Sequence, residues 1–335
     1  MNRTVSVLTA LVVVQLALTV ALAFSGQDYG AFRSDQKLMA LDVEAVDRIV
    51  IQGEEGQSVE MSKDGDKWFL PDLDRFPVAP QPAEALLTKV ADLAKGWPVA
   101  SSRSAADRFK VGAEKFERKL TFFEDNQEIG TLFLGTSPSF RKVNARVSGE
   151  DEIYNITFNS YEASAKSEDW VDKDFLNLKN EDIVRATLPA FTLERNDEKF
   201  TVTGLKQDEK TNEEEVETFI EKLAAPTFQS VLGTDNKPEY GQDSPVLEIT
   251  LELKDGEQIA YVYSKPESGD HFVLKTSAHL YFFKVSKYAF DRLKEFDQKK
   301  VVQKITQDGA DTDDNEKSPE PVSSGASESG ISESN

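Results

Sequence analysis

The sequence holds few side chains whose types and spacing could support catalysis or metal binding. Its two histidines are His271 and His279, and neither has a carboxylate or the other histidine at the spacing of a metal site. Cysteine is absent, which excludes disulfides, thiolate metal ligands and cysteine nucleophiles. The motifs for a nucleophilic serine, a bound nucleotide or a catalytic zinc are absent as well. We therefore predict that the protein is not an enzyme and binds no metal or cofactor.

Two further segments favour a structural interpretation. Gly135-Thr136-Ser137-Pro138-Ser139 is rich in small residues, but it lacks the lysine and the following helix of a phosphate-binding loop, so we predict a turn between strands. Glu213-Glu214-Glu215 begins a predicted helix, where carboxylates interact favourably with the positive end of the helix dipole. Thr211 and Glu214 also have the spacing of a capping box. We expect these acidic residues to stabilise the helix start.

A basic cluster contrasts with the charge of the whole chain. Arg141, Lys142 and Arg146 follow closely after Phe140, although the formal net charge is −21. Alternate residues of a strand share a face, so Lys142 and Arg146 are expected on one side. Two interpretations stay open: a strand edge protected by charge, or a contact site for an acidic partner. The overall negative charge repels phosphates, so we expect no nucleic-acid partner.

The N-terminus predicts where the protein resides. The run Val5–Phe24 holds no charged residue and, at about 1.5 Å per residue, spans the hydrocarbon core of a bilayer. Arg3 precedes the run, which favours a cytoplasmic N-terminus and an exported body. Residues 1–27 are therefore predicted to anchor the chain in a bacterial inner membrane, with the body in the periplasm. A cleaved signal peptide is the alternative, because Ala21-Leu22-Ala23 resembles a cleavage site.

The remaining sequence divides into a large globular part and a polar tail. Of the 335 residues 39% are hydrophobic, including 21 phenylalanines, which is enough to form a core. From residue 307 to residue 335 the chain consists mainly of Ser, Glu, Asp, Gly and Pro. Such a composition cannot bury enough apolar surface to fold, so we predict a disordered acidic tail.

The globular part reads as two copies of one unit, residues 40–176 and 177–300. In the first copy a strand-like run, a hairpin with an Asp-Gly turn and an amphipathic helix precede four further strands, and the second copy repeats this order. Leu93-Ala94 matches Leu223-Ala224 at an offset of about 130 residues, and Tyr161 matches Tyr288 at about 127. A repeat of this length indicates a duplicated domain.

The strand patterns also predict the fold class. Apolar and polar residues alternate along the strands, which is typical of antiparallel sheets with one solvated face. Runs of strands with one main helix in each unit predict an α+β fold. We expect Trp68, Trp97 and Trp170 to be anchors in the core or at a hinge, with residues 170–176 linking the two units.

An ordered set of short motifs carries a resemblance over roughly residues 40–300. The motifs are Val46–Ile51, Lys67–Pro71, Gly96–Val99, Leu134–Ser137, Arg141–Val143 and Asp169–Lys173. Together they resemble the bacterial family described as domain of unknown function 4340. The resemblance implies no catalytic residues, because the family has no established activity. It implies as partners an ABC-type permease and ATPase and an auxiliary protein of the gliding-motility type.

Two functions follow as hypotheses. The first is a non-enzymatic, membrane-anchored accessory subunit of an ABC-transporter-like complex, in which the extracytoplasmic body docks or scaffolds other subunits through Arg141, Lys142 and Arg146. The alternative is a periplasmic module that binds a glycan or a small ligand. Neighbouring genes for an ATPase and a permease would favour the first hypothesis, and cell-wall genes would favour the second.

Overall fold

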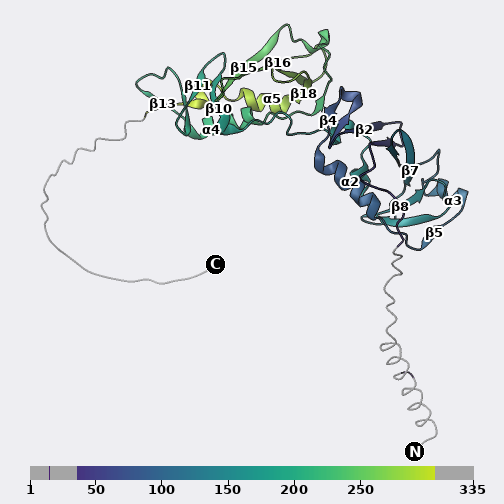
Figure 1. Cartoon of the computed structure of the whole chain (residues 1–335). Helices are drawn as coiled ribbons and strands as arrows, with labels where there is room; N and C mark the ends of the chain where they lie inside the picture. The colour runs from purple at the N-terminus through teal and green to yellow at the C-terminus, as the bar shows by residue number, and fades with distance from the viewer. Residues whose placement is uncertain (1–14, 16–35, 306–335) are drawn as a thin grey trace, which may run out of the picture.

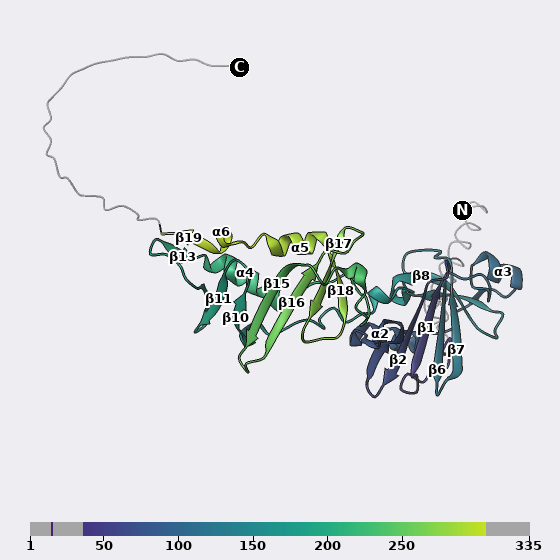
Figure 2. The same ribbon diagram turned by 90° about the horizontal axis from the view of Figure 1, so that it is seen from above.

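The computed structural model describes residue 15 and residues 36–305. This part of the chain forms two large antiparallel sheets with few helices, which confirms the predicted α+β class. Figures 1 and 2 show the two sheets one after the other along the described body. In Figure 1, strand β4 (Phe76–Pro77) of the first sheet lies close to strand β18 (Phe282–Ser286) of the second.

The first sheet has nine strands in the order β4-β3-β2-β1-β6-β7-β8-β9-β5. Strand β1 shows why these residues form a sheet: buried and half-buried residues alternate along it, and Ile49 and Ile51 are fully buried. The strands are β1 (Arg48–Gly53), β2 (Ser58–Asp64), β3 (Lys67–Leu70), β4 (Phe76–Pro77), β5 (Pro98–Ala100), β6 (Arg118–Glu124), β7 (Gln127–Leu134), β8 (Lys142–Val147) and β9 (Ile153–Thr157).

The second sheet has eight strands in the order β12-β11-β10-β15-β16-β17-β18-β14. A separate two-stranded sheet, which the sequence did not predict, pairs β13 with β19. The strands are β10 (Ile183–Thr187), β11 (Thr192–Asn196), β12 (Lys199–Val202), β13 (Glu209–Thr211), β14 (Ser230–Val231), β15 (Pro245–Leu253), β16 (Gln258–Ser264), β17 (His271–Thr276), β18 (Phe282–Ser286) and β19 (Val302–Lys304).

One main helix accompanies each sheet, and Figure 2 shows α4, α6 and α5 along the same side of the second sheet. The α-helices are α2 (Pro80–Asp92), α3 (Arg103–Arg108), α4 (Glu213–Ala224), α5 (Lys287–Lys294) and α6 (Gln298–Val301), and the short 3₁₀ helices are η1 (Pro71–Leu73), η2 (Ser160–Ala163), η3 (Ser167–Asp169), η4 (Asn180–Asp182) and η5 (Pro238–Tyr240). Helix α3 was not predicted.

The predicted capping box at the start of α4 is wrong. Asn212, not Thr211, is the N-cap residue, and its side chain makes no capping hydrogen bond. Thr211 belongs to β13, where its hydroxyl accepts a hydrogen bond from the amide of Val202. The acidic first turn of α4 is present as predicted, and Glu213 and Glu215 also pair with Lys199 and Lys300.

Apart from β4, which has no counterpart in the second sheet, the two sheets have the same order of strands. Read in chain order, β1, β2, β3, β5, β6, β7, β8 and β9 occupy the places that β10, β11, β12, β14, β15, β16, β17 and β18 occupy in the second sheet. Helix α2 lies between β4 and β5 in the chain, and α4 lies between β13 and β14. This likeness agrees with the expected duplication, which stays a prediction.

The buried side chains of α2 and α4 give a different register for the match between the two main helices. In α2 the buried residues are Ala83, Leu86, Leu87 and Val90, and in α4 the same spacing gives Val216, Phe219, Ile220 and Leu223. Leu223 therefore corresponds to Val90 rather than to Leu93, about one helical turn away from the predicted partner. Tyr161 and Tyr288 each lie two residues after an N-cap, Asn159 or Ser286, which agrees with the predicted match between them.

An aromatic cluster joins the two units. Phe76 of β4 is fully buried, and its ring centroid lies 4.6 Å from that of Phe175, 5.0 Å from that of Tyr281 and 6.1 Å from that of Phe283. Beside the cluster, the Asp74 carboxylate accepts hydrogen bonds from the amide of Thr234 at 2.7 Å and from its hydroxyl at 2.9 Å. Residues 170–176, predicted as the link between the units, thus contribute Phe175 to their junction.

Of the three tryptophans, two fulfil the prediction of a buried anchor. Trp68 and Trp170 are buried, and the indole nitrogen of Trp170 donates to the carbonyl of Ser164 at 2.8 Å. The prediction is wrong for Trp97, which is 71% exposed at the residue before the short edge strand β5.

The predicted anchor, residues 1–27, and the predicted tail, residues 307–335, lie outside the described residues, apart from Gln15. Within the part of the chain that the structure describes, no helix is both long and apolar enough to cross a membrane.

Candidate partner-binding surface

The predicted basic cluster lies at the connection between β7 and β8. Phe140 is 84% exposed, and the guanidinium carbon of Arg141 lies 5.0 Å from the centroid of its ring. Arg141 has a positive φ of 55°, which turns the chain into β8. The ammonium group of Lys142 donates to the hydroxyl of Thr157 on β9 at 2.8 Å. Phe140, Arg141 and Lys142 are called the basic loop below.

Arg146 does not join this loop. Its Nε donates to the carbonyl of Val111 at 2.7 Å, one terminal nitrogen donates to the carbonyl of Glu150 at 3.0 Å, and its guanidinium carbon lies 4.7 Å from the centroid of the Phe133 ring. Burial lowers the pKa of Arg146. The expectation that Lys142 and Arg146 share one partner-facing side is therefore replaced by a structural role for Arg146, which holds residues 103–117 against the sheet.

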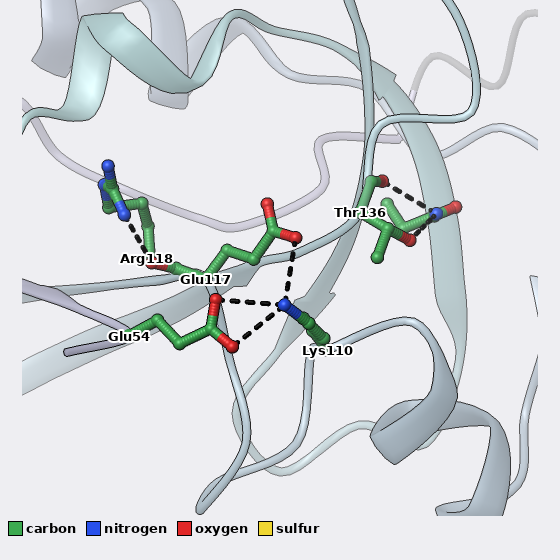
Figure 3. A network of polar contacts seen from close by, with 6 residues as sticks. Glu54, Lys110, Glu117, Arg118 and Thr136 are labelled. Atoms are coloured by element: carbon green, nitrogen blue, oxygen red, sulfur yellow. Dashed lines mark hydrogen bonds and ion pairs between the residues drawn. The ribbon is translucent and has the colours of Figure 1, made fainter.

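Gly135 and Asn144 fix the base of the basic loop. A Cβ atom on Gly135 would lie 2.0 Å from the carbonyl oxygen of Phe109, so only glycine fits there. The side-chain amide of Asn144 donates to the carbonyl of Thr136 at 2.9 Å and to its hydroxyl at 3.0 Å (Figure 3). This confirms the predicted turn after Gly135 and shows what holds it in place.

A second set of contacts holds the neighbouring segment. The Lys110 ammonium lies 2.8 Å from one oxygen of Glu54 and 3.7 Å from an oxygen of Glu117, as Figure 3 shows. The hydrogen bond to Glu54 and the two negative charges raise the pKa of Lys110, against the smaller opposing effect of desolvation. Residues 103–117 are thus joined to the turn after β1 by an ion pair. The basic loop packs beside this segment, because Gly135 at its base lies next to Phe109.

The two histidines lie in different surroundings. The ring of His279 lies with its centroid 4.4 Å from that of Phe175, and burial, with a smaller effect of Lys275, lowers its pKa. His271 begins β17, and burial together with Lys284 and Lys265 lowers its pKa. Among the described residues no group of three or more His, Cys, Asp or Glu side chains could hold a metal ion.

Two grooves that the sequence did not predict lie beside the main helices. The first, called the α2–η2 groove, has a volume of about 260 Å³ and is lined by Lys89, Tyr161, Glu162 and Trp170 among others. The second, called the α4–α5 groove, has a volume of about 360 Å³ and is lined by Lys222, Tyr263, Tyr288 and Arg292 among others. Each groove lies between the main helix of its unit and the short helix that follows the last long strand.

The grooves have corresponding residues. Tyr161 is 76% exposed and Tyr288 is 74% exposed. Lys89 and Lys222 both occupy the last turn of a main helix. The next position differs in chemistry: Glu162 lies three residues after the N-cap of η2 and forms a short ion pair with Lys89, whereas Ala289 is the third residue after the N-cap of α5. The same site is therefore internally paired in the first unit and has no carboxylate at this position in the second.

Comparison with known proteins gives one match. Residues 68–245 match the family described as Domain of unknown function (DUF4340), slightly more than half of the chain. The matched segment runs from β3 of the first sheet to the start of β15 in the second, so it includes parts of both units. No curated protein and no solved structure matches the chain.

Proposed function

The chain belongs to the family of domain of unknown function 4340, and from this premise we propose that it is a non-enzymatic, membrane-anchored accessory subunit of an ABC-transporter-like complex. Its body would lie in the periplasm of a bacterium and would dock or scaffold the permease, with its ATPase, and a gliding-motility-type auxiliary protein. The anchor would be the uncharged run Val5–Phe24.

The observation that carries this proposal is the basic loop. An exposed phenylalanine beside two cations, on a loop fixed at its base by Gly135 and Asn144, is an uncommon feature in a chain of net charge −21. An exposed aromatic ring can supply apolar contact area, and aromatic residues and arginine are enriched in interfaces. The two cations would attract an acidic partner and increase the rate of association more than the affinity.

The test is recovery of the membrane complex with the full-length tagged chain at low salt. Replacing both Arg141 and Lys142 with Glu should reduce recovery of the permease and the ATPase, and a high-salt wash of the unmodified complex should have a similar effect. The matched control replaces Lys237 and Lys265 with Glu, which changes the charge equally on the second unit and should leave recovery unchanged. Equal recovery in the unmodified protein and both variants would refute docking through the basic loop.

Membrane anchoring is tested separately. Alkaline phosphatase fused after residue 305 should be active, and the full chain should stay in the membrane fraction after a carbonate wash. An inactive fusion would contradict the proposed orientation, and a soluble periplasmic form that begins near Phe24 would indicate cleavage instead.

A further inference from the structure

The α4–α5 groove combines two cations with a mostly apolar wall. Lys222 comes from the last turn of α4 and Arg292 from the last turn of α5. Between them the lining includes Val285, Ala289 and Leu293. A volume of about 360 Å³ is within the range of small-molecule sites, which are typically apolar with a few polar groups that orient the ligand.

The cations of this groove are poorly neutralised. Within residues 36–305, Lys222 forms no ion pair, and Arg292 has one pairing, at 3.7 Å from Glu295, with half of its side chain exposed. No Asp or Glu is among the described residues that line the groove. Since the whole chain carries −21, a groove with two cations and no lining carboxylate is complementary to an anion.

A nearly buried tyrosine forms part of the wall of the groove. Tyr263 lines the groove and is only 4% exposed. Burial, with a smaller effect of Tyr261, raises the pKa of Tyr263, so it stays a neutral donor at neutral pH. A tyrosine hydroxyl can donate and accept a hydrogen bond, so Tyr263 adds one polar group to a mostly apolar wall.

Tyr288 adds a flat apolar surface at the rim of the groove. Its side chain is 74% exposed at the first turn of α5. An exposed tyrosine ring offers its face to another ring, and such contacts are favourable beyond the area they bury. The groove thus provides charge, a hydrogen-bond donor and a stacking surface for one ligand.

We propose that the α4–α5 groove binds a small carboxylate that carries a ring, with its carboxylate at Lys222 and Arg292 and its ring against Tyr288. The Tyr263 hydroxyl donates a hydrogen bond to the bound ligand. This binding activity goes beyond the proposed docking function and does not depend on it, because the basic loop lies in the other unit.

The α2–η2 groove provides the internal control. There the corresponding lysine, Lys89, is engaged by Glu162, and Asp169 also lines the groove. Because its cation is already paired, the α2–η2 groove should not bind the same ligand. A glutamate placed at Ala289 should reproduce this pairing in the second unit and close its groove to anions.

The experiment is calorimetric titration of the full-length protein with 2-naphthoate, with uncharged 2-naphthamide and with tri-galacturonate. We expect binding of at least one of the two carboxylates and none of the amide. Binding of naphthoate alone indicates an aromatic acid as the natural ligand class, and binding of tri-galacturonate alone indicates an acidic sugar. Binding of the amide as tightly as the acid, or no carboxylate binding below about 1 mM, overturns the proposal.

Substitutions locate the site. Lys222→Ala should weaken carboxylate binding about tenfold, which corresponds to the loss of one charged hydrogen bond, and Ala289→Glu should weaken it at least as much. Lys89→Ala is the matched control and should leave binding unchanged, while circular dichroism verifies that each variant is folded. Equal effects of Lys89→Ala and Lys222→Ala would place the ligand elsewhere and overturn the proposal, whatever the outcome of the docking test.

Discussion

The two units have one order of strands but differ at their surfaces. In the first unit, the cation beside the exposed tyrosine is paired with Glu162, and Lys110 and Arg146 hold residues 103–117 beside the basic loop. In the second unit, the corresponding lysine has no such partner, and a groove of about 360 Å³ lies beside it. The shared order of strands therefore does not determine which side chains lie at the surface, and each unit can make a different interaction.

The largest expected effect concerns the cluster where the two units meet. Phe76→Ala should destabilise the protein by about 3–5 kcal/mol, because it opens a cavity among Phe175, Tyr281 and Phe283. Phe140→Ala, at an exposed position, should change stability by less than about 0.5 kcal/mol. Urea unfolding measures both. A small effect of Phe76→Ala would mean that the two units fold without help from their junction.

A second prediction tests which residues of α2 and α4 occupy corresponding positions. Leu87 and Ile220 are buried at corresponding positions of α2 and α4, so Leu87→Ala and Ile220→Ala should each cost about 2–5 kcal/mol in the free energy of unfolding. Glu217, which the offset of 130 would pair with Leu87, is exposed, and Glu217→Ala should be nearly neutral. If Glu217→Ala were as costly as Ile220→Ala, the corrected register would be wrong.

The third prediction concerns the base of the basic loop, a feature of the first unit. Gly135→Ala should cost about 1–3 kcal/mol, because the new Cβ overlaps the carbonyls of Phe109 and Lys110. Gly96→Ala is the control, since a Cβ there meets no atom within 4 Å. The measurement is again urea unfolding, together with hydrogen exchange at Asn144. Unchanged stability and exchange in Gly135→Ala would show that the loop base is not held as described.

The smallest effect is the pH dependence of the Lys89–Glu162 pair. Desolvation opposes ionisation of Glu162, but hydrogen bonds from Lys89 and Asn159 outweigh it and lower its pKa from the ordinary value of 4.5. The lowered pKa means that the pair stabilises the fold above about pH 4.5 and loses this contribution as the pH falls through the folded-state pKa. The stability difference between the natural chain and Glu162→Gln should therefore shrink in acid. Ala289→Gln in the second unit should show no such change, and a pH-independent difference for Glu162→Gln would contradict the pairing.

The sequence predicted the fold class and the turn at Gly135, because these depend on local alternation and on turn chemistry. It misplaced the helix match by about one turn, since apolar residues recur every three or four positions in both helices and several offsets fit almost equally well. This ambiguity is why Leu223 was matched with Leu93 instead of Val90. Only the burial of side chains against the sheet distinguishes the two offsets.

Of the candidate site residues, Arg141 and Lys142 could be located from the sequence and Arg146 could not. The role of Arg146 depends on carbonyl groups of Val111 and Glu150, and no local pattern reveals the approach of residues 103–117 to β8. The exposure of Trp97 likewise depends on its place beside an edge strand. The two grooves arise from contacts between helices distant in sequence, although the matching tyrosines Tyr161 and Tyr288 were a usable signal.

The most direct test of the difference between the two units is the reactivity of their corresponding lysines. Brief acylation of the full-length protein, followed by mass spectrometry, compares Lys222 with Lys89 in one sample. Because Lys89 is engaged by Glu162 and Lys222 has no such partner, Lys222 should be modified faster, and Glu162→Ala should raise the rate at Lys89 towards that of Lys222. Equal rates in the natural chain, or no change at Lys89 in Glu162→Ala, would contradict the account of one paired and one open site.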